Sequence, residues 1–332
     1  MTDHGTGDAA TAAAVVIDAA EARGLALAAA GARADDYARE SRAANTRRAY
    51  RSDWRDFSDW CAHHGRTALP ATPETVALYL AARAETLKTA TLQRRLAAIS
   101  QAHQAADLDT PTTDRAVRRV MTGIRRTKGT AQEAKEAAVT RDLRRMLTTL
   151  PPTVRGRRDR ALLLVGFAGA FRRSELVGLD VADLRVQPDG LVITLRRAKT
   201  DQAGAGRRLG LPYGRDAATC PVRAVQDWLT VSGIAAGPLF RGVDKDDRIA
   251  PTRLSDRTVA RVVKRAAAAA GLDPARYAGH SLRAGLATSA AAAGTSERVI
   301  MAQTGHKSLP MVRKYIRDGS LFAQNAAADA GL

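Results

Sequence analysis

The sequence is poor in cysteine, with only Cys61 and Cys220, and neither belongs to a CxxC pair or a Cys/His cluster. We therefore expect two reduced thiols that pack as small hydrophobic groups. No apolar run approaches the ~18 residues of a membrane span. The N-terminal residues MTDHGTGDAATAAAVV also lack the basic region of a signal peptide. These absences predict a cytoplasmic protein with no membrane partner.

Motifs for nucleotides and metals are missing as well. The chain has no GxxxxGK(S/T) loop for ATP or GTP, no GxGxxG turn for a dinucleotide and no HExxH pair for zinc. It also lacks a carboxylate cluster spaced for Mg²⁺. We therefore expect no cofactor and no metal, so that any cleavage of nucleic acid would proceed without a metal ion.

The charge of the chain is unbalanced. Lys and Arg number 52 against 34 acidic residues, which gives the 332 residues a net charge of +18. Such an excess repels itself unless a polyanion lies nearby, and nucleic acid is the usual one. A basic protein could instead coat an anionic membrane, but that usually needs a strong amphipathic anchor or lipidation.

Composition and periodicity divide the chain into five parts. Residues 1–35 are rich in Ala and Gly, hold few large apolar groups, and are expected to form a flexible arm. Residues 36–127 predict a helical bundle, 128–138 a polar linker, 139–318 a second domain and 319–332 a C-terminal segment.

The first domain is expected to be entirely helical. Aromatic residues recur at helical spacing in NTRRAYRSDWRDFSDWCAHHG, where Asn45 and Thr46 are candidate N-caps. A second helix is expected to start with Thr72 as its cap and Pro73 at the first helical position. We expect the arginines of this bundle to face outward.

The second domain is expected to combine helices with a small sheet. Apolar residues alternate at 184–186 and again at 191–195, with PDG between them, which predicts an antiparallel hairpin. Residues 207–212 are expected to add a third strand. From CPVRAVQDWL onward the chain predicts helices again. The predicted fold class is therefore mainly α, a helical bundle followed by an α-rich domain with a small antiparallel β-sheet.

Two pairs of residues in the second domain are spaced to share a helix face. Arg172 and Glu175, in FRRSEL, are three residues apart and can pair, although such a pair is most often a surface salt bridge. His280 and Arg283, in GHSLRAG, have the same spacing, although a lone histidine is more often a core or capping residue. Lys199, in RRAKTD, follows a strand where a hairpin tip would hold it out, but a lysine in a basic run is usually solvated.

The stretch GHKSLPMVRKYIR contains His306 and Tyr315. Ser308 and Pro310 suit a helix start, and a tyrosine on an amphipathic helix is most often a half-buried packing residue. Metal-free phosphoryl transfer, however, needs a nucleophile, cations around the phosphate and an acid for the leaving oxygen. The tyrosine, two histidines, two arginines and a lysine of this domain can supply all three.

The order of these residues resembles the tyrosine recombinase (phage integrase) family. The FRRSEL box, the RAKT lysine, the HxxR pair, the GH dipeptide and the last tyrosine follow the family's order, and their final intervals fit it. SRAANTRRAYRSDWRDFSDWC and TLQRRLAAISQAH resemble the family's helical core-binding domain. The resemblance covers residues 36–320 and implies a two-domain clamp around DNA.

The resemblance implies a site-specific recombinase that cuts and rejoins DNA strands. The reaction would pass through a 3′-phosphotyrosine and a Holliday junction, without metal or ATP. Seven residues receive roles: Tyr315 as nucleophile, Lys199 as acid for the leaving 5′ oxygen, His280 as general acid/base, Arg172, Arg283 and His306 as phosphate ligands, and Glu175 as the group that orients the site.

The resemblance also implies which residues meet DNA. Residues 254–272 predict a basic helix on which Arg257, Arg261 and Lys264 share one side. Arg257 is expected to contact guanine, with a phosphate contact or a solvated face as the alternative. In the first domain, mostly phosphate contacts are expected from Arg47, Arg48, Gln93 and Arg94.

Further partners follow from the resemblance alone. The expected substrate is double-stranded DNA with an inverted-repeat recombination site, bound by a homotetramer on two such sites, with accessory DNA-bending proteins. Phe322 is expected to insert into a neighbouring protomer. The alanine- and arginine-rich composition suggests a bacterial or phage protein associated with the nucleoid. Two alternatives stay open: a type IB topoisomerase-like nicking-closing enzyme, and a catalytically inactive DNA-binding protein of the same fold.

Overall fold

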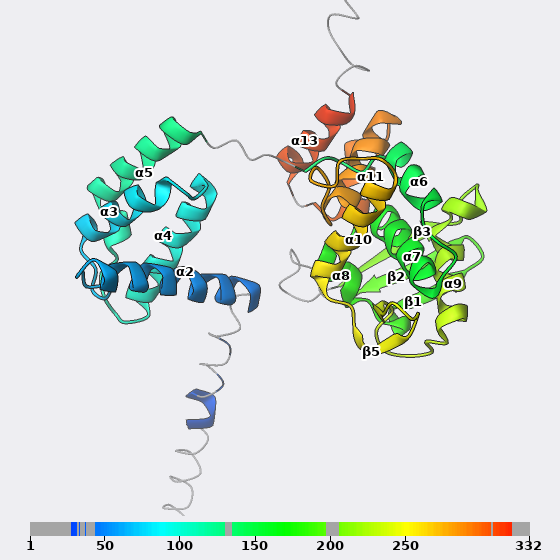
Figure 1. The fold of residues 1–332 in the computed structure, drawn as a ribbon, viewed down its shortest axis with the longest axis horizontal. Coiled ribbons are helices and arrows are strands. Elements are labelled where there is room, and N and C mark those ends of the chain that lie inside the picture. The colour runs from blue at the N-terminus through cyan, green and yellow to red at the C-terminus, as the bar shows by residue number, and fades with distance from the viewer. Residues whose placement is uncertain are drawn as a thin grey trace, which may run out of the picture. The chain divides into compact units, whose positions relative to one another are not determined.

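The computed structural model describes residues 28–31, 33, 37, 44–129, 135–196, 206–306 and 308–320. The chain divides into two compact units, residues 1–132 and 133–332, here called unit 1 and unit 2 (Figure 1). Lys199, Phe322 and most of the predicted arm lie outside the described residues. Within the described ranges, no helix is both long enough and apolar enough to cross a membrane.

Unit 1 is a bundle of helices around an aromatic core. Its elements are α2 (Ala44–His63), α3 (Pro73–Ala84), α4 (Thr89–Gln104), the 3-10 turn η1 (Pro111–Thr113) and α5 (Arg115–Lys128). Phe57 of α2 and Tyr79 of α3 are fully buried, and their rings meet edge to face at 5.0 Å. Burial of each such side chain contributes about 1.5–3 kcal/mol, so this core holds α2 and α3 together.

The helix starts of unit 1 match the sequence in one case and differ in another. Thr72 caps α3 as predicted, because its hydroxyl accepts the backbone N–H of the third helical residue, and Pro73 occupies the first helical position. The prediction of Asn45 or Thr46 as N-cap was wrong. Since α2 begins at Ala44, both residues lie inside its first turn, and alanine is itself a strong helix former.

Unit 2 is rich in helices and contains two small antiparallel sheets (Figure 1). The helices are α6 (Thr140–Thr148), α7 (Val154–Ala168), α8 (Arg173–Gly178), α9 (Pro221–Ser232), α10 (Asp256–Ala269), α11 (Ser281–Ala292), α12 (Glu297–Thr304) and α13 (Leu309–Ser320), with 3-10 turns η2 (Val181–Asp183) and η3 (Ala217–Thr219). Helix α7 is buried along most of its length and packs against α9 and α11, so it forms the centre of the unit.

The first sheet has the predicted hairpin and the predicted third strand. Strands β1 (Leu184–Gln187), β2 (Gly190–Leu195) and β3 (Arg207–Pro212) pair antiparallel in that order. The prediction of helices alone after residue 220 was wrong, because β4 (Arg241–Val243) and β5 (Ile249–Arg253) form a second pair. These strands are short and none of their residues is fully buried, so they leave no alternation of apolar residues to detect.

A small apolar cluster joins the last three helices. Ala287 of α11, Ile300 of α12 and Val312 of α13 are buried together, apart from the main core of the unit. This cluster holds α13 against α11 and α12, and it thereby brings the residues that the sequence singled out into one place.

Candidate active site

Tyr315 lies on α13, on the side that faces α11. The helix begins directly after Ser308 and carries Pro310 in its first turn, as the sequence predicted. Val312, one turn earlier, is fully buried, and the ring of Tyr315 packs on the same cluster. The packing fixes the ring and directs its hydroxyl toward the start of α11.

His280 is the partner of that hydroxyl. It precedes α11, and its Nε2 lies 2.8 Å from the Tyr315 hydroxyl oxygen, within hydrogen-bond distance. Partial desolvation and the nearby Arg283 and Arg172 lower the pKa of His280 below its ordinary value. A histidine that is neutral at pH 7 can accept the tyrosine proton, so this pair has the geometry of a nucleophile and its base.

Arg283 is almost completely buried on α11, with 1% of its surface exposed. Its Nη1 donates to the carbonyl of Ala170 at 2.8 Å, and Ala170 itself has a left-handed backbone with φ of 49°. Nη2 is buried and has no hydrogen-bond partner among the described residues. Burial, and then the charge of Arg172, lower the pKa of Arg283 to about 10. A buried donor without an acceptor destabilises the fold by about 1–3 kcal/mol. An anionic ligand that accepts from Nη2 would remove this cost.

Arg172 and Glu175 form the predicted pair. Arg172 occupies the N-cap position of α8, and its Nη1 donates to Glu175 at 2.5 Å, while its backbone N–H donates to the other carboxylate oxygen at 2.9 Å. Glu175 is buried and therefore holds Arg172 at two points. A guanidinium has five N–H donors, so Arg172 keeps others to bind an anion.

His306 is buried directly after α12 and Gly305. Its Nδ1 lies 2.8 Å from the hydroxyl of Thr304, and its ring centroid lies 5.8 Å from that of Tyr315. Burial, and then the charges of Arg283 and Arg172, lower the pKa of His306 to about 4. The imidazole is therefore neutral at pH 7, with a defined partner on one nitrogen.

Arg207 is a further cation at this place, and the sequence analysis did not identify it. Burial lowers its pKa, the carboxylate of Glu175 raises it, and the charge of Arg172 lowers it, so all three side chains share one electrostatic environment. The signal that could have found it is the alternation in β3. Arg207 shares the inner side of the strand with Leu209 and Leu211, whereas Arg208 points to solvent.

The cluster as a whole is suited to an anion. His280 and His306 lie beside Tyr315, and Arg283 interacts electrostatically with Arg172, Arg207, Glu175 and Tyr315, so an added phosphate would meet several donors in one place. Among the residues that the structure describes, no three histidine, cysteine or carboxylate side chains gather as a metal-binding group. The predicted Lys199 lies outside those residues.

The predicted DNA-reading helix of unit 2 exposes its basic side. Arg257, Arg261 and Lys264 of α10 are all exposed, and Arg261 donates to the Thr258 hydroxyl at 2.8 Å. Val259, Val262 and Val263 are buried on the opposite side. The helix is thus amphipathic, with its cations available to a partner.

The four predicted residues of unit 1 differ in their surroundings. Arg48 and Gln93 are exposed, and Arg47 is partly buried. Arg94 donates to the buried carboxylate of Asp53 at 2.6 Å and 3.0 Å, and these hydrogen bonds raise its pKa. Arg94 therefore joins α4 to α2, while 48% of its side chain stays exposed.

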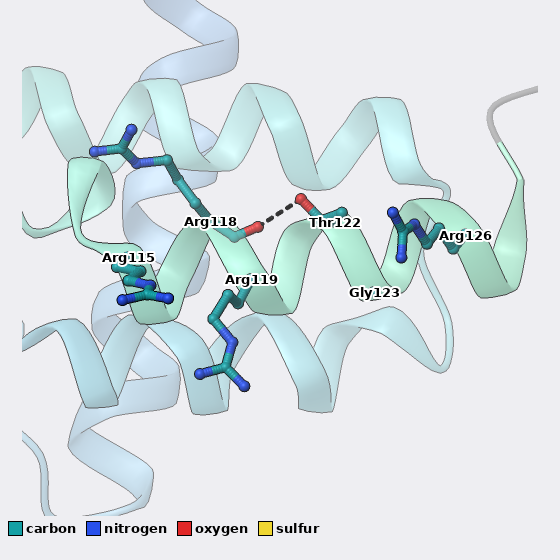
Figure 2. A pocket seen from close by; sticks show the side chains of 6 residues that line it. All are labelled: Arg115, Arg118, Arg119, Thr122, Gly123 and Arg126. Atoms are coloured by element: carbon teal, nitrogen blue, oxygen red, sulfur yellow. Dashed lines mark hydrogen bonds between the residues drawn. The ribbon is translucent and has the colours of Figure 1, made fainter.

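A basic groove on α5 was not predicted as a site. Figure 2 shows that Arg115, Arg118, Arg119 and Arg126 line one face of the helix around Thr122 and Gly123. The groove is open to solvent and has a volume of about 600 Å³. Every charged residue of α5 is basic, and none of these four arginines pairs with a carboxylate in the described part of the chain. The sequence signal was the repeat of arginines at helical spacing opposite Val117 and Met121.

Comparisons with known proteins agree on one family. The sequence matches the model "Phage integrase family" over residues 136–320 and "Phage integrase, N-terminal SAM-like domain" over residues 36–107. It is 44% identical to the integrase/recombinase xerD homolog of Selenomonas ruminantium, over 86% of this chain and 85% of that protein. It is 30% identical to recombinase cre of Escherichia phage P1, over 80% of this chain and 81% of that protein.

Solved structures share the fold at lower identity. The XerH site-specific recombinase bound to its palindromic difH substrate aligns with a TM-score of 0.59 at 17% identity, covering 77% of this chain and 72% of that one. The Tn1549 transposon integrase in complex with transposon right end DNA aligns with a TM-score of 0.60 at 16% identity, covering 84% of this chain and 91% of that one.

Proposed function

Because this chain belongs to the phage integrase family and is a tyrosine recombinase, we propose that it cuts and rejoins DNA strands through a covalent bond between Tyr315 and a 3′ phosphate. The observation that carries the proposal is the 2.8 Å contact between the Tyr315 hydroxyl and His280 Nε2. This contact lies beside three arginines that surround one buried carboxylate.

The first step exchanges one phosphate ester for another. Tyr315 gives its proton to His280 Nε2 as its oxygen attacks the scissile phosphorus, and the bond from phosphorus to the 5′ oxygen breaks. The leaving 5′ oxygen takes a proton from Lys199. One phosphorus–oxygen bond forms as another breaks, so the link stores the energy for rejoining and no ATP is needed.

The arginines bind the phosphate while its charge develops. Arg283 donates through its buried Nη2 to a non-bridging oxygen, which supplies the acceptor that this atom lacks among the described residues. Arg172, held by Glu175, binds a non-bridging oxygen with its remaining donors. Both groups are fixed by the fold before substrate arrives, which is how such donors lower the barrier of the chemical step.

His306 donates a hydrogen bond to the phosphate through Nε2. This role requires the proton on Nε2, and therefore an Nδ1 that accepts. The Thr304 hydroxyl lies 2.7 Å from the carbonyl of Ile300 and 2.8 Å from Nδ1, and it selects that tautomer when its single proton turns from the carbonyl to Nδ1. Because its pKa is lowered to about 4, His306 acts as a neutral donor at pH 7.

The second step reverses the first with another strand. A 5′ hydroxyl from a partner duplex attacks the 3′-phosphotyrosine and releases Tyr315, which yields a Holliday junction after one exchange. Four protomers on two inverted-repeat sites perform the two exchanges, with Phe322 joining neighbours and accessory proteins bending the DNA. We place this reaction in the cytoplasm, at the nucleoid.

Both units contact the DNA. The exposed cations of α10 give unit 2 a helix for the major groove, with Arg257 on guanine. In unit 1, Arg47, Arg48, Gln93 and Arg94 contact phosphates, and the groove of α5 adds a second set of phosphate contacts (Figure 2). Phosphate contacts supply affinity and register, whereas the sequence preference comes from α10.

A suicide substrate tests the proposal. A pool of duplexes tiled from the DNA that flanks the gene, each with a nick near one end, is incubated with the protein in the presence of EDTA. Cleavage near the nick releases a short fragment and traps the covalent complex. We expect a protein–DNA adduct with the wild-type chain and none with Tyr315→Phe, and sequencing of the trapped DNA identifies the site.

Each other outcome selects a different function. Tight binding without an adduct would indicate an inactive DNA-binding protein of this fold. If the protein forms the adduct and relaxes a supercoiled plasmid, but gives no recombinant product from DNA that carries two copies of the identified site, it is a nicking-closing enzyme. An adduct that persists in Tyr315→Phe would contradict the assignment of the nucleophile.

A further inference from the structure

Arg207 is the first residue of β3 and points to the inner side of the sheet. Leu209 and Leu211 on the same side are buried, whereas Arg208 is exposed on the other side. Arg207 is half-buried, whereas most arginine side chains in proteins are exposed. The strand therefore delivers one guanidinium toward the helices of unit 2 and the next one to solvent.

The guanidinium of Arg207 caps the end of α12. Its Nη1 donates to the carbonyl oxygens of Ala302 at 3.1 Å and Gln303 at 3.2 Å. Carbonyls in the last turn of a helix lack partners within the helix and carry the negative end of its dipole, so a cation is favoured there. Arg207 thus ties β3 to the helix that ends two residues before His306.

Gly305 shows how closely the two segments approach. Its backbone is left-handed, with φ of 67°, and a Cβ placed on it would lie 2.6 Å from Nη1 and 2.9 Å from Cζ of Arg207. The left-handed conformation strains any residue other than glycine at this position, and a Cβ there would displace the guanidinium of Arg207. The turn between α12 and His306 therefore rests on the guanidinium plane.

A second contact anchors the same turn from another side. The Gln303 side chain donates to the carbonyl of Ala168, at the end of α7, at 2.7 Å. Two residues further along, Ala170 accepts from the buried Arg283. The end of α12 is thus held between β3 and the end of α7, and both supports lie next to phosphate-binding residues of the proposed site.

The charge of Arg207 acts on the same group. Burial comes first among the causes that lower the pKa of His306, followed by Arg283, Arg172, His280 and Arg207. Loss of the charge at position 207 would therefore raise that pKa, whereas loss of the charge at position 208 would leave it unchanged.

We propose that Arg207 is a positioning residue of strand cleavage, which holds the end of α12 and so places the His306 imidazole against the scissile phosphate. This inference rests on the proposed function, because it gives Arg207 the task of placing His306 in the proposed active site. A displacement of about 1 Å in a catalytic group can cost 10²-fold in rate. We therefore expect a loss of roughly 10- to 100-fold in cleavage when Arg207 no longer holds the turn.

Three variants test the inference on the duplex that the wild-type chain cleaves. Arg207→Gln removes both the positive charge and the guanidinium group. Arg207→Lys keeps the charge but has no guanidinium. Arg208→Gln is the matched control on the opposite side of the strand. We expect slow adduct formation with both Arg207 variants and a wild-type rate with Arg208→Gln. Arg207→Lys retains a cation and serves as the folded test case if Arg207→Gln does not fold.

A readout on the protein alone separates positioning from mere stability. The pKa of His306, followed by NMR of the imidazole in the full chain, should rise in Arg207→Gln and stay unchanged in Arg208→Gln. Wild-type cleavage rates in both Arg207 variants would overturn the inference while leaving the proposed function intact. A lowered rate with an unmoved His306 resonance and pKa would also overturn it. No adduct with the wild-type chain, or an adduct with Tyr315→Phe, would instead refute the proposed function.

Discussion

Thr304 and His306 share a hydrogen bond of 2.8 Å between the threonine hydroxyl and the imidazole Nδ1, and both side chains are buried. The same hydroxyl lies 2.7 Å from the carbonyl of Ile300, which can accept its single proton. One proton therefore has two acceptors, and its position decides which nitrogen of His306 is the donor. Substrate binding would favour the tautomer with the proton on Nε2.

The first prediction concerns this tautomer. Thr304→Val removes the hydroxyl at almost constant volume, so Nδ1 loses its donor and the Nε2–H form is no longer selected. We expect adduct formation to fall by about 10²-fold, the usual cost of losing one positioned donor. Thr304→Ser keeps the hydroxyl and should stay close to the wild-type rate. Equal rates in the two variants would show that Thr304 does not select the tautomer.

The second prediction concerns His280 as the base. His280→Gln can still contact the Tyr315 hydroxyl but cannot take its proton at neutral pH. The rate of adduct formation should fall by about 10²–10⁴-fold, with affinity for the duplex unchanged. Raising the pH should recover part of the rate in the variant, because hydroxide then assists ionisation of the tyrosine. A pH profile parallel to that of the wild-type chain would exclude the role.

The third prediction concerns stability and pH. The pKa of His306 is lowered from 6.5 to about 4 in the folded chain, so the unfolded chain binds more protons between these values. The free energy of unfolding should therefore fall as the pH drops through this window, by on the order of 2 kcal/mol from this group between about pH 6.5 and pH 5. Urea unfolding of the wild-type chain and of His306→Gln measures it.

The variant His306→Gln should have a flatter pH dependence than the wild-type chain over that window. His280, whose pKa is also lowered, remains in both proteins and cancels in the comparison. If the free energy of unfolding depends on pH identically in the two proteins, burial and the surrounding arginines do not lower the pKa of His306.

The fourth prediction concerns the basic groove of α5. Replacing Arg119 and Arg126 with glutamine should weaken binding to all duplexes alike, because phosphate contacts carry no sequence information. The slope of log K against log salt should become shallower by roughly 2, about 0.9 for each lost contact. Arg66→Gln, at an exposed arginine that lies 3.7 Å from Glu74, is the control. An unchanged slope would remove α5 from the interface.

Much of the fold followed from periodicity and turn chemistry. The PDG turn and the flanking apolar alternation predicted β1 and β2, because sheets with one buried side leave that pattern in the sequence, and the third strand expected at 207–212 was confirmed as β3. Strands β4 and β5 left no such pattern in the sequence, because both are short and no residue of either is fully buried. The family itself followed from the order of the polar residues, and the comparisons confirmed it.

The site was harder to predict in its supporting residues. Spacing could place Arg172 beside Glu175, because both belong to one helix start. It could not bring Arg207 to the end of α12, because that contact joins segments almost a hundred residues apart in the chain. Nor could it reveal that Arg94 is paired with Asp53 across two helices. The roles of the seven predicted catalytic residues stay predictions for the experiments above.

The small cluster that holds α13 has a consequence for control of the enzyme. Three buried side chains, Ala287, Ile300 and Val312, with the ring of Tyr315, form a core separate from the main one. Among the described side chains of α13, only Val312 is fully buried, and burial of an apolar side chain such as Val312 or Ile300 contributes about 1.5–3 kcal/mol. The nucleophile helix can therefore undock by local unfolding while α7 and the sheet stay folded. Hydrogen exchange of α13 should be faster than that of α7, and the fraction of time that α13 stays docked would set how often Tyr315 is in position to react.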